Sequence, residues 1–380
     1  MQQVETYQKV FSSIKDSLPQ WSQLTLEDVD FSSSVGLTNI VYIIKVKLTK
    51  KGQTLPNSLI YREFKENSLF IITENERKYF MELGNSGFGP KCYALTDKFR
   101  LEEFIEGQHP ESKEMLDKKF NRRFSKCIAE IHNFNVSVSD KTPIVLKILN
   151  EDNCFIKFIN ESLDTTPHEK KFEFKTKTLI KEFFGNKEEI SFLREKLPQN
   201  SEAICFCHND LNKTNFFYFE KDEKISFSII DCDYSGYNYR GFDLASYIVE
   251  IPYNYSYFPK IEYFEERELD IPALKDISKY YIFFNFAQKY KIIYDENLII
   301  DDDKKIDEIL EKSDLINLFN QKLEEFFEEL KIGLLLCYFY YGIWILCKGV
   351  ETIEEEYDRI GLVELKIRIY KNRKRQFFNI

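Results

Sequence analysis

Glycine and proline are scarce in this chain, with 13 and 10 residues among 380. Collagen-like and low-complexity disordered chains need far more of both, so these classes are excluded. Apolar side chains are instead abundant, because 43% of the residues are hydrophobic and 16% are aromatic, including 35 Phe and 23 Tyr. The chain can therefore bury a large core, and its length suits one bilobal unit or two domains of about 150 residues each.

The 8 cysteines contain no C-x-x-C pair, and free thiols are favoured over a disulfide framework. Cys205 and Cys207 are expected to point to opposite faces of an extended segment. Four further cysteines lie in apolar stretches, where a free thiol behaves as a small hydrophobe: Cys127, Cys154, Cys337 and Cys347. The first residues, MQQVETYQKVFSS, show no signal-peptide pattern, so we expect a reducing, cytoplasmic setting.

Excess positive charge and a long apolar run are also missing. The formal net charge is −10, so general binding to nucleic acid, which requires a basic face, is not expected. The longest uncharged apolar stretch, Ile332 to Cys347, has 16 residues and contains three Tyr. A membrane span needs about 20 apolar residues. This stretch therefore predicts a buried helix of a large lobe and no membrane span.

Sequence patterns typical of strands predominate in the first hundred residues, and patterns typical of helices predominate in the rest of the chain. Residues 36–48 and 58–64 are rich in β-branched and aromatic residues, which indicates strands, and a helix is expected from about residue 74 to 83. From about residue 112 onward, apolar residues recur at helical spacing. We therefore predict an α+β, bilobal fold, with a small antiparallel β-sheet lobe with one helix at 1–107 and a larger, mainly α-helical lobe at 108–380.

Polar residues crowd between two apolar runs in ICFCHNDLNKTNFFYF, residues 204–219. An Asx-rich turn between two strands would explain the stretch by itself. A second run, FSIIDCDYSGYNYRGFD, delivers Asp231 at a strand end, sixteen residues after Asn215. Together with Asp210 this makes an H-x-D-x-x-x-x-N…D pattern. Phosphoryl transfer needs these side chains, a carboxylate to accept the hydroxyl proton and oxygen ligands for Mg²⁺, so kinase chemistry is favoured over the turn.

The segments FCHNDLNKTN and IIDCDYSGYNYRGFD, followed by Glu250, resemble the choline/ethanolamine kinase family. This family has the protein-kinase-like fold and stands beside the aminoglycoside phosphotransferases. The resemblance is strongest over residues 204–257. It implies an ATP-dependent kinase that phosphorylates the hydroxyl of choline or ethanolamine, the first step of the CDP-choline and CDP-ethanolamine routes to phospholipids.

The resemblance also assigns roles around a catalytic loop at 206–216 and a metal-binding segment at 229–234. Asp210 would be the general base, and Asn215 and Asp231 would hold Mg²⁺. His208 would shape the loop, and Asp243 would tie the loop backbone together. For Asp233, contact with a second Mg²⁺ and exposure to solvent are both left open.

The small lobe matches the family in part, and the implied contacts are with ATP. The segment SSSVGLTN resembles the phosphate-facing loop, Arg62 the strand-borne basic residue, and Glu76 the helix carboxylate that pairs with it. The segment 100–107 resembles the hinge, whose backbone would meet adenine. The cofactor-binding residues expected from this resemblance are Ser33, Ser34, Arg62, Glu76, Glu103 and Ile105.

The implied alcohol pocket combines a carboxylate with aromatic faces, as a quaternary ammonium requires. Its expected members, beside Asp210, are Glu250, Tyr255, Tyr341 and Trp344. The last two replace the family's pair of tryptophans, and their three-residue spacing puts both rings on one helix face. A further aromatic residue of choline-binding members is missing near Tyr357, where Ile360 stands. Choline is slightly favoured, and an ethanolamine-selective kinase stays open.

Two other functions fit less well. An aminoglycoside phosphotransferase would favour acidic residues over an aromatic cage, and a non-catalytic kinase-like binding module would not need Asp210, Asn215 and Asp231 together. The expected small-molecule partners are ATP with Mg²⁺ and choline or ethanolamine. The sequence is compatible with a homodimer and does not decide the oligomeric state.

Overall fold

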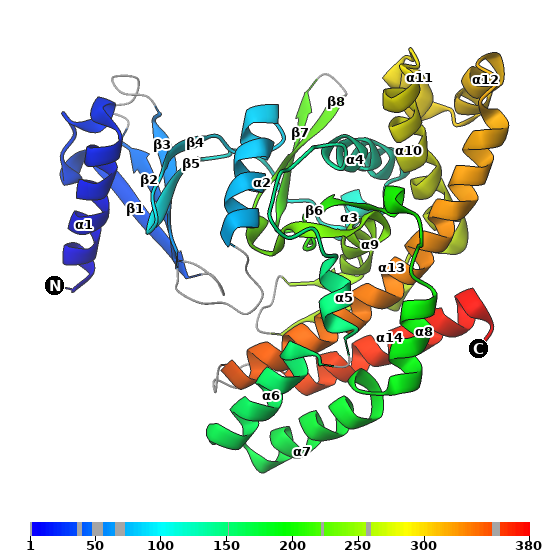
Figure 1. Cartoon of the computed structure of the whole chain (residues 1–380). Helices are drawn as coiled ribbons and strands as arrows, with labels where there is room; N and C mark the ends of the chain where they lie inside the picture. The colour runs from blue at the N-terminus through cyan, green and yellow to red at the C-terminus, as the bar shows by residue number, and fades with distance from the viewer. Residues whose placement is uncertain are drawn as a thin grey trace. The chain divides into compact units, whose positions relative to one another are not determined.

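Five strands near the N-terminus form one antiparallel sheet in the computed structural model of the chain (Figure 1). Their order is β1 (Val29–Val35), β2 (Ile40–Val46), β3 (Ser58–Glu63), β5 (Phe99–Glu103) and β4 (Cys92–Leu95). Helix α2 (Thr73–Ser86) lies between β3 and β4 in the chain. The structure describes residues 2–35, 40–47, 56–64, 73–150, 152–221, 224–255, 260–351 and 358–380.

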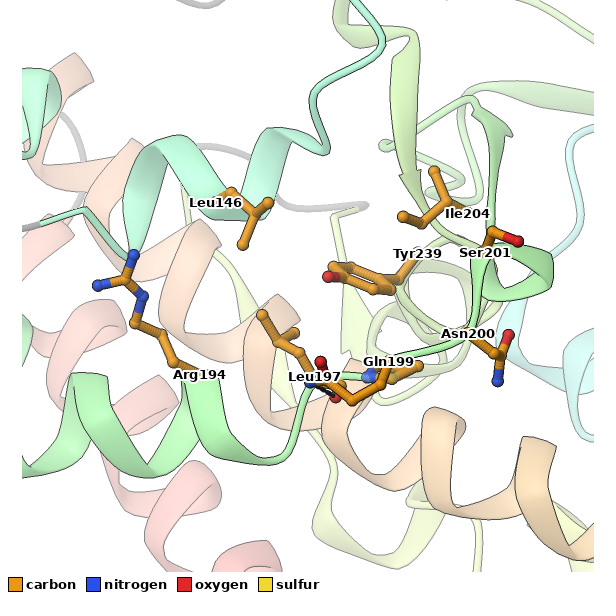
Figure 2. Close-up of a pocket in the computed structure, with 9 residues that line it drawn as sticks. Leu146, Arg194, Leu197, Gln199, Asn200, Ser201, Ile204 and Tyr239 are labelled. Atoms are coloured by element: carbon orange, nitrogen blue, oxygen red, sulfur yellow. Dashed lines mark hydrogen bonds between the residues drawn. The ribbon is translucent and has the colours of Figure 1, made fainter.

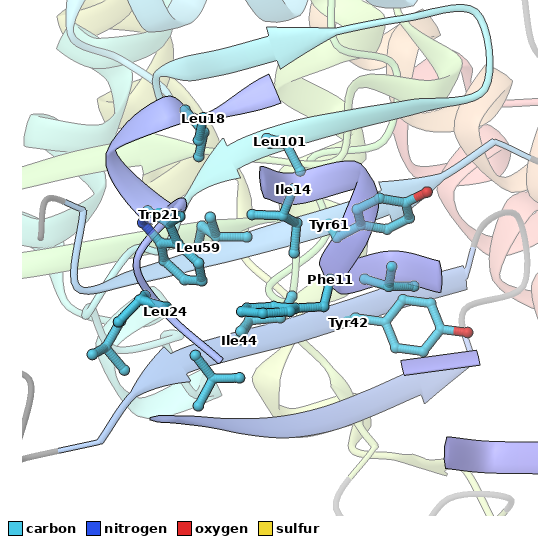
Figure 3. Close-up of a cluster of buried hydrophobic side chains, with 13 residues drawn as sticks. Phe11, Ile14, Leu18, Trp21, Leu24, Tyr42, Ile44, Leu59, Tyr61 and Leu101 are labelled. Carbon is cyan, nitrogen blue, oxygen red and sulfur yellow. The ribbon is translucent and has the colours of Figure 1, made fainter. Parts of the chain in front are cut away.

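Side chains alternate between the two faces of these strands, and the apolar ones on one face form a hydrophobic core with helix α1 (Gln2–Ser17). Ile44 and Leu59 point to the same face of the sheet and meet Phe11 and Ile14 of the helix (Figure 3). Trp21, which follows α1, is fully buried in this cluster and donates its indole N–H to the carbonyl of Pro56. Each such aliphatic or aromatic side chain contributes about 1.5–3 kcal/mol when buried, so the cluster fixes α1 on the sheet.

Contacts divide the chain into two units. The N-terminal unit comprises Met1–Gln108, Phe217–Phe219 and Phe227–Tyr234, and the helical unit comprises the rest of the chain. The hairpin of β7 (Phe216–Lys221) and β8 (Lys224–Ile229) carries the chain from one unit to the other. Asp231 therefore belongs to the N-terminal unit, whereas Asp210 and Asn215 belong to the helical unit.

The helical unit is built around one long helix, α13 (Ile316–Glu351), which packs against α9 (Arg240–Glu250), α10 (Ile271–Tyr290) and α14 (Arg359–Phe378). Gly241 permits the close crossing of α9 and α13, because a Cβ atom there would lie 2.6 Å from the carbonyl oxygen of Glu329. The other helices are α3 (Ser112–Met115), α4 (Lys118–Ile131), α5 (Ile144–Ile148), α6 (Cys154–Thr165), α7 (Lys170–Leu179), α8 (Lys187–Glu195), α11 (Glu296–Asp301) and α12 (Lys304–Lys312).

Helix α13 is long and apolar enough to cross a membrane, yet 83% of its most apolar stretch is buried within the structure. This burial agrees with the core helix expected from residues 332–347. The predicted fold class is confirmed as well, because a five-stranded antiparallel sheet is followed by a largely helical region.

Besides the β7–β8 hairpin, the described residues form two short strand pairs among the helices. These are β6 (Ile204–Cys207) with β9 (Gly236–Tyr239), and β10 (Tyr253–Asn254) with β11 (Glu262–Tyr263). The expectation that Cys205 and Cys207 face opposite sides of their strand was wrong. Residues two apart in a strand share a face, and their Sγ atoms lie 3.5 Å apart. Cys154 is also exposed at the start of α6, whereas Cys127, Cys337 and Cys347 are buried as expected.

Candidate active site

The loop after β6 is held by one buried carboxylate. Asp243 in α9 accepts the backbone N–H groups of His208 at 2.9 Å and Asn209 at 2.7 Å. Asn209 has a φ of +66°, a left-handed conformation that Asn adopts more readily than most residues. The predicted tying role of Asp243 is confirmed, and the loop that carries Asp210 is rigidly attached to α9.

Asp210 and Asn215 lie together at the end of this loop. The amide Nδ2 of Asn215 donates to Oδ2 of Asp210 and to its backbone carbonyl, at 2.9 Å each. Asn212 donates to the same carboxylate oxygen at 3.2 Å. These bonds fix the orientation of the Asp210 carboxylate, which is half-buried. Because both amide hydrogens of Asn215 point to Asp210, its Oδ1 faces away from that residue.

His208 is fully buried beside Asp210. Its Nδ1 accepts the backbone N–H of Asp210 at 3.3 Å, so the imidazole supports the backbone of the loop. This geometry agrees with a shaping role for His208.

Three of the predicted alcohol-pocket residues, Glu250, Tyr255 and Tyr341, lie near Asp210 within the helical unit. The hydroxyl of Tyr341 in α13 lies 3.5 Å from Oδ1 of Asp210, and the hydroxyl of Tyr255 donates to Glu250 at 2.5 Å. Burial and the nearby carboxylates Asp210 and Glu250 raise the pKa of Tyr255 well above its ordinary value. Trp344 is half-buried one helical turn after Tyr341, and Tyr357 lies outside the described residues. Carboxylate and phenol groups thus lie together beside Asp210.

Two buried lysines beside these residues were missed by sequence reasoning. Lys366 of α14 is 4% exposed, and its Nζ lies 4.4 Å from the ring centre of Tyr253 and 5.3 Å from that of Tyr341. Lys213 donates to the hydroxyl of Ser112 and to the backbone carbonyl of Tyr253. Burial lowers the pKa of both ammonium groups, although Glu250 counteracts part of the effect. The predicted acceptor side chains are therefore accompanied by two buried ammonium groups.

In the N-terminal unit, Arg62 takes part in a buried ion network on the sheet. Its Nε lies 2.7 Å from Oε1 of Glu102, and Arg100 donates to the same oxygen at 3.0 Å. Arg100 also pairs with Glu76 of α2 at 2.5 Å. The expected direct pair of Arg62 with Glu76 was wrong, because within the described residues Glu76 pairs with Arg100, whereas Arg62 pairs with Glu102 and Asp231.

Asp231 follows β8 and meets the same network within the N-terminal unit. Its Oδ1 lies 3.3 Å from Nη1 of Arg62, and its φ of +61° turns the chain sharply after the strand. The side chain of Asp231 is 36% exposed, which leaves part of the carboxylate accessible. Asp233 is 3% exposed, so the solvent-exposed alternative for this residue was wrong.

The other residues predicted to contact ATP lie in β1 and at the end of β5, and part of the expected phosphate loop is outside the described residues. Ser33 and Ser34 lie in β1 opposite Tyr42 and Val41, and residues 36–39 of the expected phosphate loop lie outside the described residues. Glu103 ends β5, and its N–H already donates to the carbonyl of Lys91 at 2.9 Å. That donor is therefore engaged, while Ile105 is half-buried two residues after the end of β5.

Two cavities in the helical unit contain none of the predicted site residues. One, of about 410 Å³, is lined by residues around the end of α8 and the start of β6 (Figure 2). It has Arg194 at one side and no carboxylate in its lining, so it lacks the groups that phosphoryl transfer requires. The other, of about 550 Å³, reaches His132 and Cys205 behind the catalytic loop.

Comparison with known proteins identifies the relatives of this chain. The family model described as Choline/ethanolamine kinase matches residues 32–371. A Homo sapiens protein named Choline/ethanolamine kinase is 22% identical over 307 residues, which cover 80% of this chain and 69% of the relative. A Dictyostelium discoideum protein named Probable ethanolamine kinase A is 26% identical over 261 residues, 68% of this chain and 70% of the relative.

The match spans between 48 and 69% of the length of three mammalian relatives. Among solved structures, a choline kinase from Cryptosporidium parvum superposes with a TM-score of 0.69 at 18% identity, covering 98% of this chain and 96% of that one. This likeness establishes the protein-kinase-like fold. The family model covers most of the chain, and the chain therefore belongs to the choline/ethanolamine kinase family, ATP-using phosphotransferases with an alcohol acceptor.

Proposed function

We propose that this chain transfers the γ-phosphoryl group of ATP to the hydroxyl of choline or ethanolamine, with Asp210 as the general base. The observation that carries the proposal is the position of Asp210. Its carboxylate is fixed by Asn215 on one side and lies beside the Tyr341 hydroxyl of the alcohol pocket on the other. A hydroxyl bound in this pocket would hydrogen-bond to the carboxylate and lose its proton to it as the phosphoryl group arrives.

The donor atoms offered by Asn215 and Asp231 suit Mg²⁺. Both are oxygens, the ligands that this hard cation prefers, and Oδ1 of Asn215 is directed away from Asp210 by the two bonds of Nδ2. Asp231 keeps a partly exposed carboxylate. When bound, Mg²⁺ would neutralise charge on the ATP phosphates. Arg62, anchored by Glu102, would contribute a fixed positive charge toward the same phosphates.

A side-by-side assay tests the proposed function. The purified chain with Mg²⁺ and ATP should release ADP in the presence of choline or ethanolamine, and mass spectrometry should detect the phosphorylated alcohol. An aminoglycoside such as kanamycin should give no more ADP than the reaction without acceptor. ADP release with neither small alcohol, or only with the aminoglycoside, would contradict the proposal.

The lysine in the pocket favours ethanolamine as the better acceptor. A quaternary ammonium donates no hydrogen bonds and depends on aromatic faces, but the ammonium of Lys366 already lies over Tyr253 and Tyr341. A primary ammonium carries three N–H donors, which Glu250 and the surrounding hydroxyls can accept. The proposed preference is therefore for ethanolamine, the primary amine, over choline.

Substituting Lys366 by Met tests this selectivity. The change keeps the length of the side chain and removes its charge, so kcat/KM for choline should rise by about tenfold relative to that for ethanolamine, a shift of about 1.4 kcal/mol. Lys371→Met, at an exposed position of the same helix, is the matched control and should leave the ratio unchanged. An unchanged ratio in the Lys366 variant would show that this ammonium does not select the acceptor.

A further inference from the structure

Behind the catalytic loop, two thiols and one imidazole converge. Cys205 and Cys207 project from the same face of β6 with their Sγ atoms 3.5 Å apart, and His132 follows the end of α4. The donor atoms of these three side chains all lie within 4.8 Å of one another. We call Cys205, Cys207 and His132 the thiol–imidazole cluster. None of its members takes part in the phosphoryl transfer proposed above.

We propose that the thiol–imidazole cluster binds one zinc ion. Tetrahedral zinc has Zn–S bonds of about 2.3 Å, which place two sulfur ligands about 3.8 Å apart, close to the separation of the Cys205 and Cys207 Sγ atoms. Sulfur and imidazole donors select zinc over Mg²⁺, which requires oxygen ligands. The ion is therefore distinct from the Mg²⁺ of the reaction.

The surroundings of His132 match those of a metal-bound imidazole. Its Nε2 lies 2.9 Å from Oδ2 of Asp243, and a carboxylate on one ring nitrogen is the usual partner of a histidine that binds zinc through the other. Nδ1 is then the ligand nitrogen. It lies 2.8 Å from the hydroxyl of Tyr281, and zinc binding exchanges that hydrogen bond for a Zn–N bond.

The cluster has a path to solvent and a balanced charge. His132, Cys205 and Tyr281 line the cavity of about 550 Å³, which gives zinc an entry route and supplies a water molecule as fourth ligand. Two Zn–S bonds and one Zn–N bond form, and the protons that the donors carry leave to solvent. Two thiolates neutralise the divalent ion. The charged groups of the cavity wall are already paired, Arg240 with Glu329, and both Lys289 and Lys322 with Glu202.

Zinc at this position would brace the catalytic loop from behind. Cys207 directly precedes His208, and Asp243 links His132 to the backbone N–H groups of His208 and Asn209. The ion would thus connect β6, α4 and α9 at the base of the loop that carries Asp210.

Metal content and cobalt spectra test the proposal on the full-length, untagged chain. After loading with Zn²⁺ and passage over a chelating resin, the wild type should retain one zinc per chain. Cys205→Ser and Cys207→Ser should bind at least about 100-fold more weakly, because even the outer partners of a zinc ligand contribute 10–100-fold. Cys154→Ser, at an exposed thiol of α6, is the matched control and should retain the ion.

Cobalt binding can be measured on the wild type alone, so this test stands even if the cysteine variants fail to fold. Co²⁺ bound to the wild type should show thiolate-to-cobalt charge-transfer absorption in the near ultraviolet, and Zn²⁺ should protect Cys205 from alkylation, measured by peptide mass spectrometry. Zinc retained equally by a Cys205/Cys207 double variant would overturn the proposal. Absence of the charge-transfer band in the wild type would overturn it too, whatever the kinase assay shows.

Discussion

Asp210→Asn should lower kcat by about 10³-fold, within the range of 10²–10⁴ that a positioned general base contributes. Asparagine keeps the shape of the side chain and its hydrogen bonds within the loop, but the amide cannot take up the proton of the acceptor hydroxyl. The loop should stay in place because Asp243 holds the N–H groups of His208 and Asn209 independently of residue 210. ADP release at saturating ethanolamine measures the effect.

The fold and the nucleotide affinity of this variant are the necessary controls. Circular dichroism and fluorescent ATP-analogue binding should match the wild type within about twofold, because the charge removed lies at the acceptor alcohol. Asp140→Asn, at a surface loop outside the site, is the matched substitution and should leave kcat unchanged. Near-normal turnover by Asp210→Asn would show that another group accepts the proton.

The loop around Asp210 was predictable from sequence because its constraints are local. The polar run between two apolar strands, with an Asp five residues before an Asn, implies a loop presented by strands, and the structure shows Asp210 and Asn215 bonded to each other. The assignment of Asp243 to the loop backbone also followed from its motif. The catalytic and metal-binding roles themselves remain predictions that the experiments above test.

The ion-pair partners of Arg62 depend on strand register and were not predictable from the sequence in the same way. Glu76 and Glu102 were both available to Arg62, and the choice follows from the pairing of β3 with β5, where Arg62 lies opposite Arg100. Arg100 and Glu102 are two apart and share that face of the sheet, so Glu102 reaches both guanidinium groups. A sequence does not specify the register from which this follows.

Lys366 was missed for a related reason. It occupies a position on the buried stripe of α14 formed by Val363, Ile367 and Tyr370, so a charged residue at that spacing was the one available signal. Its significance comes from Tyr253 and Tyr341, which lie more than twenty residues away in the chain and on two other elements. The shared face of Cys205 and Cys207, in contrast, follows from the two-residue side-chain period of a strand, which the expectation of opposite faces misapplied.

Glu102→Gln should destabilise the N-terminal unit by about 3–5 kcal/mol, the usual effect of removing one partner from a buried ion pair. Glu102 is 2% exposed and pairs with two guanidinium groups, those of Arg62 (7% exposed) and Arg100 (1% exposed). A neutral amide leaves these two buried cations with Glu76 and Asp231 as their remaining ionised partners. The variant should also lose ATP affinity, because Arg62 is no longer anchored.

Tryptophan fluorescence can follow this unit separately. The chain has 2 Trp, so in a Trp344→Phe background Trp21, buried in the N-terminal core, reports urea unfolding there. Glu106→Gln, at an exposed position near the end of the same segment, is the control and should leave the midpoint unchanged. An unchanged midpoint in Glu102→Gln would mean that the network contributes no net stability.

The pH dependence of the stability difference between wild type and Glu102→Gln shows whether the charge of Glu102 causes it. Burial raises the pKa of Glu102, but Arg62 and Arg100 outweigh it, so the pKa is lowered overall. A carboxyl group whose pKa is lower in the folded state stabilises the fold above its unfolded pKa, and this contribution disappears as the pH falls through the folded pKa. The gap in urea midpoint between wild type and Glu102→Gln should therefore be full at neutral pH and narrow below the ordinary pKa of glutamate. A gap that stayed constant into the acid range would point to packing at Glu102 in place of its charge.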